Sequence, residues 1–143
     1  MNLTEIIQPG MNKEEYYTVA EEHTASHVGS GSLRVLATPW MILYMERTAR
    51  DFLQEHLPTG YSSVGVHVDV HHQAPSAVGS QVRITAQVLS IDGNRVIFRV
   101  EASDGQEQIG TGQHERVVVD EARFLRRIAA KIGAGTPDPS NQS

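Results

Sequence analysis

The 143-residue sequence contains no cysteine. This absence excludes disulfide bonds, thiolate metal sites and a cysteine nucleophile, so covalent chemistry would have to use a hydroxyl, a carboxylate, a lysine or a histidine. The chain also lacks any apolar run near the roughly 18 residues that a membrane-spanning helix needs. Its first residues lack the basic and then apolar layout of a signal peptide. We therefore expect a cytoplasmic protein with no membrane partner.

Basic residues are in a minority. The chain has 12 Lys and Arg against 17 Asp and Glu, which gives a formal net charge of −5. Nucleic-acid binding normally needs a basic face that displaces counterions, so this balance argues against a nucleic-acid partner. The chain also lacks the glycine-rich motifs of dinucleotide-binding and phosphate-binding loops. These absences leave a globular enzyme or binding module as the classes to consider.

The length predicts a single domain. A chain of 143 residues leaves no room for a second independent core. Hydrophobic residues make up 39% of the sequence, which is enough for a packed core. The helix and strand patterns end near residue 132, and the polar stretch after them is rich in Gly, Pro and Ser. We therefore predict one domain over residues 1–132 and a disordered tail over residues 133–143.

A core helix is predicted from residue 39 to about residue 56. Thr38 is a favoured N-cap, and Pro39 suits the first helical position, where a missing N–H costs nothing. The run WMILYM that follows is apolar on every side, which in a soluble protein indicates a helix enclosed by other structure. The segment Leu57-Pro58-Thr59-Gly60 then supplies the stop signal.

Alternating residues predict a sheet around this helix. In residues 64–72 valines alternate with polar residues, which is typical of a half-buried strand. Three more strand patterns, linked by Asp92-Gly93-Asn94 and Asp104-Gly105 turns, lie at 80–91, 95–102 and 107–119. Their predicted inward residues include Val82, Ile84, Ala86, Val88, Val96, Phe98 and Val100. The remaining elements are a first strand, a mobile loop and a C-terminal helix, at residues 15–24, 26–35 and 120–132. We predict an α+β fold with one curved antiparallel sheet around one long helix.

One histidine continues the stripe of valines in residues 64–72. Strand parity places Val64, Val66, Val68 and Val70 on one face, and His72 is next in the series. Such an imidazole is either a core histidine bonded to a backbone carbonyl or a catalytic group. Parity alone leaves both open.

Two polar residues of the predicted helix are further candidates. Glu46 follows the apolar run and lies about 80° around the helix from Thr38, so both could face one pocket. The alternatives are an exposed ion pair of Glu46 with Arg50 and a purely capping role for Thr38.

The opposite face of the strand at 64–72 carries His67, Asp69 and His71. Two imidazoles and a carboxylate at period 2 could chelate a metal, with His114 as an additional ligand. The alternative is a hydrated or dimer-facing polar stripe.

A basic cluster lies on the predicted C-terminal helix. It consists of Arg123, Arg126, Arg127 and Lys131, and residues 122–132 contain no acid. The cluster could receive an anionic ligand, or it could be a solvated face near the helix terminus.

Three collinear motifs in residues 28–132 resemble the fluoroacetyl-CoA thioesterase-like family of hotdog-fold thioesterases. They are ATPWMILYMERTAR, VGVHVDVHHQAPSAVGS and the segment from RITAQV to HERVVV. The resemblance implies a homodimer with active sites at the subunit interface and a hotdog fold. It implies an acyl-CoA substrate and no cofactor beyond the coenzyme A of that substrate.

The resemblance also implies roles for single residues. Thr38, Glu46 and His72 correspond to the family's catalytic threonine, glutamate and histidine. Gly65 corresponds to a substrate-contacting glycine and Arg116 to an arginine near the catalytic histidine, and we assign both to substrate binding. Our hypothesis for the mechanism is that a desolvated Glu46 acts as a base towards Thr38 or a water placed by it, while His72 orients the carboxylate or protonates the departing thiolate.

The loop before Thr38 departs from the family. The fluoroacetate enzyme has phenylalanines there that gate and select the acyl group, whereas this chain has Gly29, Ser30, Gly31 and Ser32. We therefore expect a more open acyl pocket and hydrolysis of another short or medium acyl-CoA to free acid and coenzyme A. The alternatives are a non-catalytic acyl-CoA-binding module, a metal-binding protein, and a hotdog dehydratase or hydratase.

Overall fold

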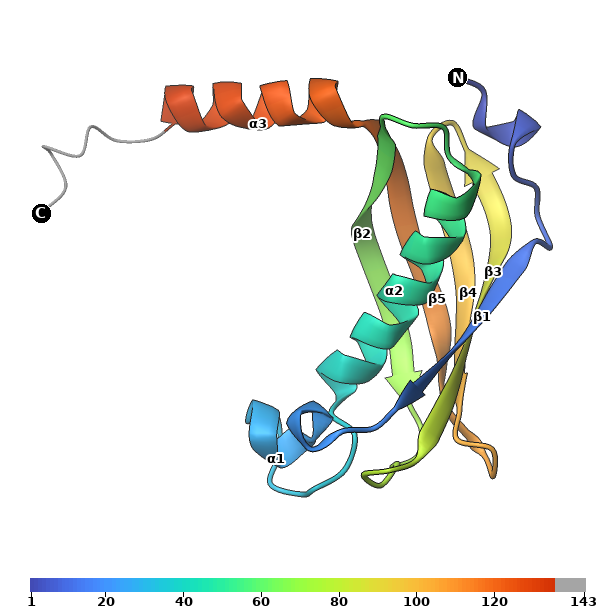
Figure 1. Ribbon diagram of the computed structural model, residues 1–143, viewed down its shortest axis with the longest axis vertical. Coiled ribbons are helices and arrows are strands. Elements are labelled where there is room, and N and C mark those ends of the chain that lie inside the picture. Colours follow the sequence, from blue (N-terminus) through green and yellow to red (C-terminus); the bar gives the residue numbers. More distant parts are fainter. Residues whose placement is uncertain (136–143) are drawn as a thin grey trace, which may run out of the picture.

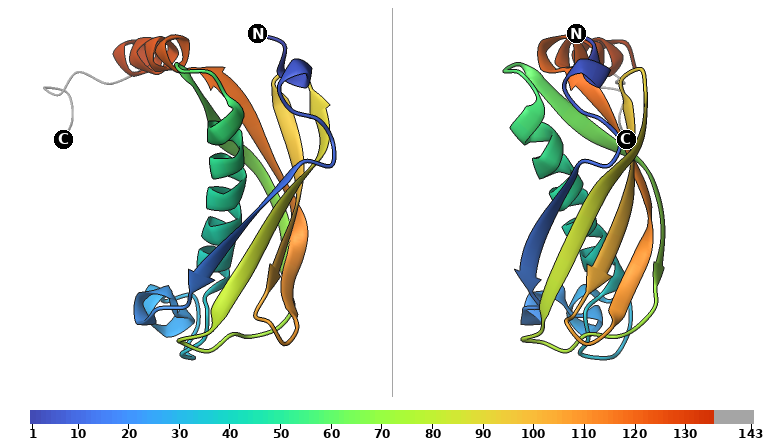
Figure 2. Two further views of the ribbon diagram at one scale, coloured as in Figure 1. Left: turned by 45° about the vertical axis from the view of Figure 1, so that its right-hand side comes forward. Right: turned by 90° about the vertical axis from the view of Figure 1, so that its right-hand side faces the viewer.

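The computed structural model describes residues 1–135 and consists of one long helix packed on a five-stranded antiparallel sheet (Figures 1 and 2). The long helix α2 spans Thr38–His56. The sheet has the order β1-β3-β4-β5-β2, so the long strand β2 forms one edge. The strands are β1 (Asn12–Thr18), β2 (Tyr61–His72), β3 (Gln81–Asp92), β4 (Arg95–Ser103) and β5 (Gln108–Asp120). The predicted α+β arrangement is confirmed.

The core lies between α2 and the concave face of the sheet (Figure 2). The seven inward residues predicted for β3 and β4 are all buried, which confirms their alternation. From α2, the buried apolar side chains are Met41, Tyr44, Met45, Ala49, Phe52 and Leu53. The rings of Phe52 and Phe98 meet edge to face with centroids 5.9 Å apart. Each large apolar side chain buried here stabilises the fold by about 1.5–3 kcal/mol.

One side of α2 stays partly open within the chain. Ile42, Leu43 and Glu46 are only half-buried, so the complete enclosure predicted from the apolar run is not seen. Thr38, Ile42 and Glu46 are spaced by four residues and therefore form one stripe on this side of the helix.

The start of α2 differs from the prediction. Ala37 is the N-cap and makes no side-chain cap hydrogen bond, while Thr38 is the first helical residue and Pro39 occupies the first turn. The Thr38 hydroxyl therefore does not cap the helix. It makes a contact with β2 that is described below.

A β-bulge in β2 changes the predicted parity of that strand. The pairing with β5 shifts between Gly65 and His67, so Val66 is an extra residue in the ladder. Gly65 pairs with Arg116 and His72 pairs with Gly110, and all four belong to the face that carries α2. The prediction that Val64 shares a face with His72 is therefore wrong, because the bulge lies between them.

The segment before α2 contains more structure than predicted. The first strand is β1, which ends at Thr18 rather than continuing to residue 24. Short helices occur at Leu3–Glu5 (η1), Glu21–His23 (η2) and Ala25–Val28 (α1). The predicted loop at 26–35 thus begins with a helical turn, and it ends in isolated bridges that tie Val35 and Leu36 to the body.

The C-terminal helix α3 spans Glu121–Gly135 and projects away from the sheet on the side of β2 (Figure 1). The helix continues three residues beyond the predicted boundary at residue 132, so residues 133–135 are not part of a disordered tail. The rest of that predicted tail, residues 136–143, lies outside the described residues. None of the helices described in residues 1–135 is long and apolar enough to cross a membrane.

Candidate active site

Thr38 and His72 meet where the start of α2 approaches the end of β2. The Thr38 Oγ1 lies 2.7 Å from the His72 Nδ1. Burial lowers the pKa of His72, and an interaction with the Ala74 backbone offsets part of this effect. The imidazole is therefore mainly neutral at pH 7. Its other nitrogen, Nε2, is buried and has no hydrogen-bond partner among the described residues.

A cavity of about 300 Å³ opens beside this pair. Its walls come from the segment before α2 and from the end of β2, and they include Ala25, Ser30, Leu36, Thr38, His72 and Ala74. Several of these side chains are small. Ser30 belongs to the loop in which the sequence predicted an open acyl pocket, and the structure places it beside the candidate threonine and histidine.

Glu46, Gly65 and Arg116 form a second cluster further along α2. The Glu46 Oε2 lies 3.6 Å from the Arg116 Nη1, and the Glu46 side chain is 38% exposed while that of Arg116 is 7% exposed. A Cβ at Gly65 would lie 2.9 Å from the Glu46 Oε2. The absence of a side chain at Gly65 therefore makes room for the carboxylate. The alternative considered from the sequence, an ion pair of Glu46 with Arg50, is not formed, because Arg50 pairs with Asp51 at 2.7 Å.

Arg116 is held in place by a network that the sequence did not predict. Its Nε donates to the Ser63 hydroxyl at 2.8 Å and its Nη2 to the Ser63 carbonyl at 3.1 Å. Its Nη1 lies 3.1 Å from the His114 Nε2. A guanidinium only donates, so the His114 Nε2 accepts. The His114 Nδ1 lies 2.8 Å from the His67 carbonyl and therefore carries the proton.

His114 is consequently fixed as a neutral imidazole. Burial is the largest cause of its lowered pKa, and the nearby Arg116 charge also lowers it. The sequence presented His114 only as a possible metal ligand. Its position in β5 two residues from Arg116, on the same face of the sheet, is the signal that could have identified it as an arginine-positioning residue.

The single chain brings the predicted site residues together in two groups. Thr38 contacts His72, and Glu46 contacts Arg116 beside Gly65. Thr38 and Glu46 are eight residues apart on the helix, which is about 12 Å along its axis. No hydrogen bond or ion pair within residues 1–135 connects the two groups. Within the single chain, the side chain of Glu46 is also less desolvated than our mechanistic hypothesis assumes.

The face of β2 that turns away from α2 carries His67, Asp69 and His71, which the sequence offered as possible metal ligands. Within residues 1–135, no group of three or more His, Asp and Glu side chains is arranged to hold a metal ion. His67, Asp69 and His71 are exposed. The His67 Nδ1 lies 3.6 Å from the Glu115 Oε2, so the polar-stripe alternative describes this face better than a chelating array.

Comparisons with known proteins agree with this fold and identify the family. The family model described as fluoroacetyl-CoA-specific thioesterase matches residues 19–122. The fluoroacetyl-CoA thioesterase of Streptantibioticus cattleyicolor is 36% identical over 101 residues, which are 71% of this chain and 73% of that protein. Both findings confirm the predicted family.

Solved structures support the same assignment. A mutant of the fluoroacetyl-CoA thioesterase in complex with acetyl-CoA has a TM-score of 0.81 and 29% identity, covering 92% of this chain and 100% of that one. A hot-dog-like protein from Thermanaerovibrio acidaminovorans has a TM-score of 0.86 and 29% identity, covering 93% and 98%. A thioesterase superfamily member from Thermus thermophilus has a TM-score of 0.79 and 31% identity, covering 90% and 97%. The chain therefore belongs to the fluoroacetyl-CoA-specific thioesterase family and is a thioester hydrolase with the hotdog fold.

Proposed function

We propose that this protein hydrolyses a short or medium acyl-CoA thioester to the free acid and coenzyme A, with Thr38, Glu46 and His72 as its catalytic residues. The observation that carries the proposal is the 2.7 Å contact between the Thr38 Oγ1 and the His72 Nδ1 at the wall of a cavity. A hydroxyl bonded to a neutral imidazole is the arrangement that general-base activation of a nucleophile requires.

The reaction needs a nucleophile, a proton acceptor and stabilisation of the oxyanion. In the proposed sequence the oxygen of Thr38, or of a water held by it, bonds to the acyl carbon while His72 accepts its proton. The carbon–sulfur bond then breaks, and the proton passes from His72 to the departing thiolate. If Thr38 itself is the nucleophile, a water then attacks the Thr38 ester, which releases the free acid and returns a proton to the Thr38 oxygen. Backbone N–H groups at Gly65 or at the start of α2 are the candidate oxyanion donors.

Glu46 and Arg116 form the second half of the proposed site. Glu46 would accept a proton from the attacking water or orient it, and Arg116 would hold the carboxylate in position through their 3.6 Å contact. Gly65 would let the thioester group of the substrate approach Glu46 closely, since any larger residue would occupy that space.

A homodimer would join the two halves of the site. The strand β2 is a twelve-residue edge, and an unpaired edge is a template for another chain. Val66 and Val68 on this strand are 46% and 39% exposed. Antiparallel pairing of two β2 strands would bring the Thr38–His72 end of one copy towards the Glu46 cluster of the second copy. It would also desolvate the half-exposed Glu46.

The acyl group is proposed to be less restricted than in the fluoroacetate enzyme. The cavity beside Thr38 is bordered by small side chains such as Ala25 and Ser30. Bulky gating rings are absent from residues 29–32 of the sequence. A short or medium chain would therefore fit without selection for a fluorinated methyl group.

The test is thiol release from a panel of acyl-CoAs of increasing chain length. Thr38→Ala, Glu46→Gln and His72→Ala should each lose about 10²-fold or more in turnover, as expected for general acid–base groups. His71→Ala is the matched control, because it removes a neighbouring imidazole from the opposite face of β2. Wild-type turnover in all three folded variants would contradict the mechanism.

The same assay separates the other functions. Binding of acyl-CoA without thiol release would favour a non-catalytic binding module. A changed acyl chain without free coenzyme A would favour a dehydratase or hydratase.

A further inference from the structure

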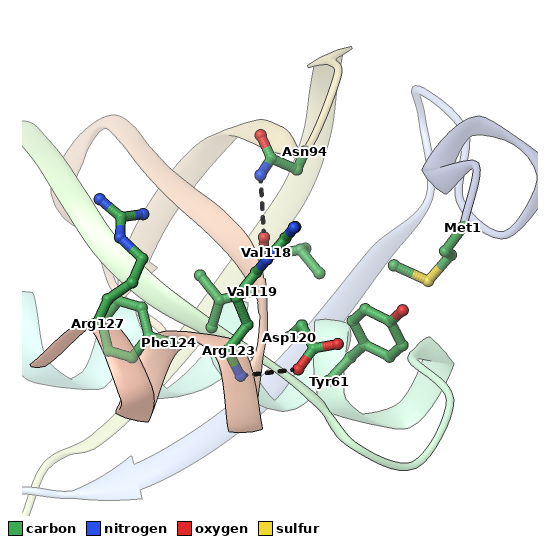
Figure 3. Close-up of a pocket in the computed structure, with 9 residues that line it drawn as sticks. All are labelled: Met1, Tyr61, Asn94, Val118, Val119, Asp120, Arg123, Phe124 and Arg127. Atoms are coloured by element: carbon green, nitrogen blue, oxygen red, sulfur yellow. Dashed lines mark hydrogen bonds between the residues drawn. The ribbon is translucent and has the colours of Figure 1, made fainter. Parts of the chain in front are cut away.

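A second cavity lies at the base of α3, away from Thr38 and His72. It has a volume of about 370 Å³ and is formed where α3 leaves β5 beside the start of β2 (Figure 3). Its lining includes Tyr61, Asn94, Asp120, Arg123, Phe124 and Arg127. The cavity thus combines two guanidinium groups with two aromatic rings.

The cationic groups of this cavity are available to a ligand. Arg123 and Arg127 are one helical turn apart, and neither forms an ion pair with a carboxylate of residues 1–135. The one acid in the lining, Asp120, accepts the backbone N–H of Arg123 at 3.1 Å. Guanidinium groups bind phosphate oxygens through paired hydrogen bonds. Rings such as those of Tyr61 and Phe124 offer faces on which a base stacks.

The position of the cavity matches the length of a coenzyme A arm. Tyr61 and Gly65 lie on the same face of β2 and are four residues apart, which is about 13 Å along a strand. The pantetheine arm has a chain of about thirteen bonds between its sulfur and the diphosphate, and at the extension of a peptide backbone this spans about 15 Å. In the proposed dimer the thioester lies at Glu46 and Gly65 of one copy, opposite the Thr38–His72 pair of the second copy. Its diphosphate would then lie beside Arg123 and Arg127 of the first copy.

We propose that this cavity binds the phosphorylated nucleotide end of coenzyme A, with Arg123 and Arg127 on its phosphates and Tyr61 and Phe124 against its adenine. The proposal rests on the proposed function, because it takes the substrate to be an acyl-CoA. It assigns a role to two of the four basic residues of α3 and leaves Arg126 and Lys131 outside the site.

Direct binding tests the proposal without turnover. The dissociation constants of coenzyme A and adenosine 3′,5′-bisphosphate are measured by isothermal titration calorimetry for wild type, Arg123→Ala and Arg127→Ala. Each variant should bind both ligands about tenfold more weakly, as the loss of a charge-assisted contact predicts. Arg126→Ala is the matched control, since it removes the same charge from the same helix without touching the cavity. Wild-type affinities in both variants, or an equal loss in the control, would overturn the proposal.

Kinetics with two substrates separate this proposal from the proposed function. In Arg127→Ala, KM should rise about tenfold for an acyl-CoA and stay unchanged for the matching acyl-pantetheine, which has no nucleotide. An equal change for both substrates would overturn nucleotide binding at this cavity. If wild type releases thiol from neither substrate, the proposed function fails, and the calorimetric comparison still decides the binding site.

Discussion

Gly65→Ala should separate catalysis from stability. The added Cβ would lie 2.9 Å from the Glu46 Oε2, 3.2 Å from the His114 Cε1 and 3.3 Å from the Arg116 Nη1. The carboxylate is the free end of a flexible side chain, so it can withdraw. His114 and Arg116 are fixed by hydrogen bonds, so the carboxylate takes up most of the movement.

The expected magnitudes follow from this geometry. Replacing a strand glycine gains about 0.5–1 kcal/mol of backbone entropy, which offsets a similar cost of crowding, so the free energy of unfolding should stay within about 1 kcal/mol of wild type. Moving the carboxylate by about 0.5 Å should lower kcat/KM by roughly ten- to a hundredfold. The assays are chemical denaturation and thiol release on the same preparation. Undiminished turnover in Gly65→Ala would refute the idea that Glu46 acts from this position.

Four further predictions use the same two assays or a measurement of size. Gly112→Ala should destabilise the fold by about 1–3 kcal/mol, because its Cβ would lie 2.1 Å from the backbone oxygen of Asp69, which cannot withdraw; an unchanged denaturation midpoint would contradict this. Burial lowers the pKa of His114, so the unfolded chain binds its proton more readily, and stability should fall by up to about 1.4 kcal/mol per pH unit below about pH 6.5. His114→Gln should flatten that slope, and an equally steep slope would assign it to other groups. Arg116→Leu should leave Glu46 without its cation and lower turnover by about tenfold or more. Turnover equal to that of wild type would show that Arg116 does not contribute to catalysis. Val68→Lys on the β2 edge should convert the proposed dimer to monomer in sedimentation, and an unchanged mass would place the interface elsewhere.

Local patterns in the sequence predicted much of the fold. Alternation identified β3 and β4 together with their buried residues, and Pro39 and Pro58 located the ends of α2 to within one residue. These signals work because each depends on neighbouring residues in the chain and on one buried face. The helical turns before α2 were missed because each is only three or four residues long, which is too short to show a helical period.

The site was less predictable because its geometry depends on strand pairing. The valines of β2 alternate without interruption, and nothing in that alternation reveals the bulge at Val66. The network around Arg116 likewise depends on which residue of β2 lies opposite it. Thr38 matched a capping pattern, yet its hydroxyl bonds a histidine 34 positions away.

The extra residue in β2 also affects how relatives are to be aligned. Seven positions separate Gly65 from His72, an odd number that would turn them to opposite sides of a regular strand. A homologue in which only six positions separate the two residues would orient both towards its helix without any irregularity. A one-residue gap opposite Val66 is therefore compatible with an intact site, whereas a gain of one residue there would require a second irregularity to keep the histidine beside the threonine.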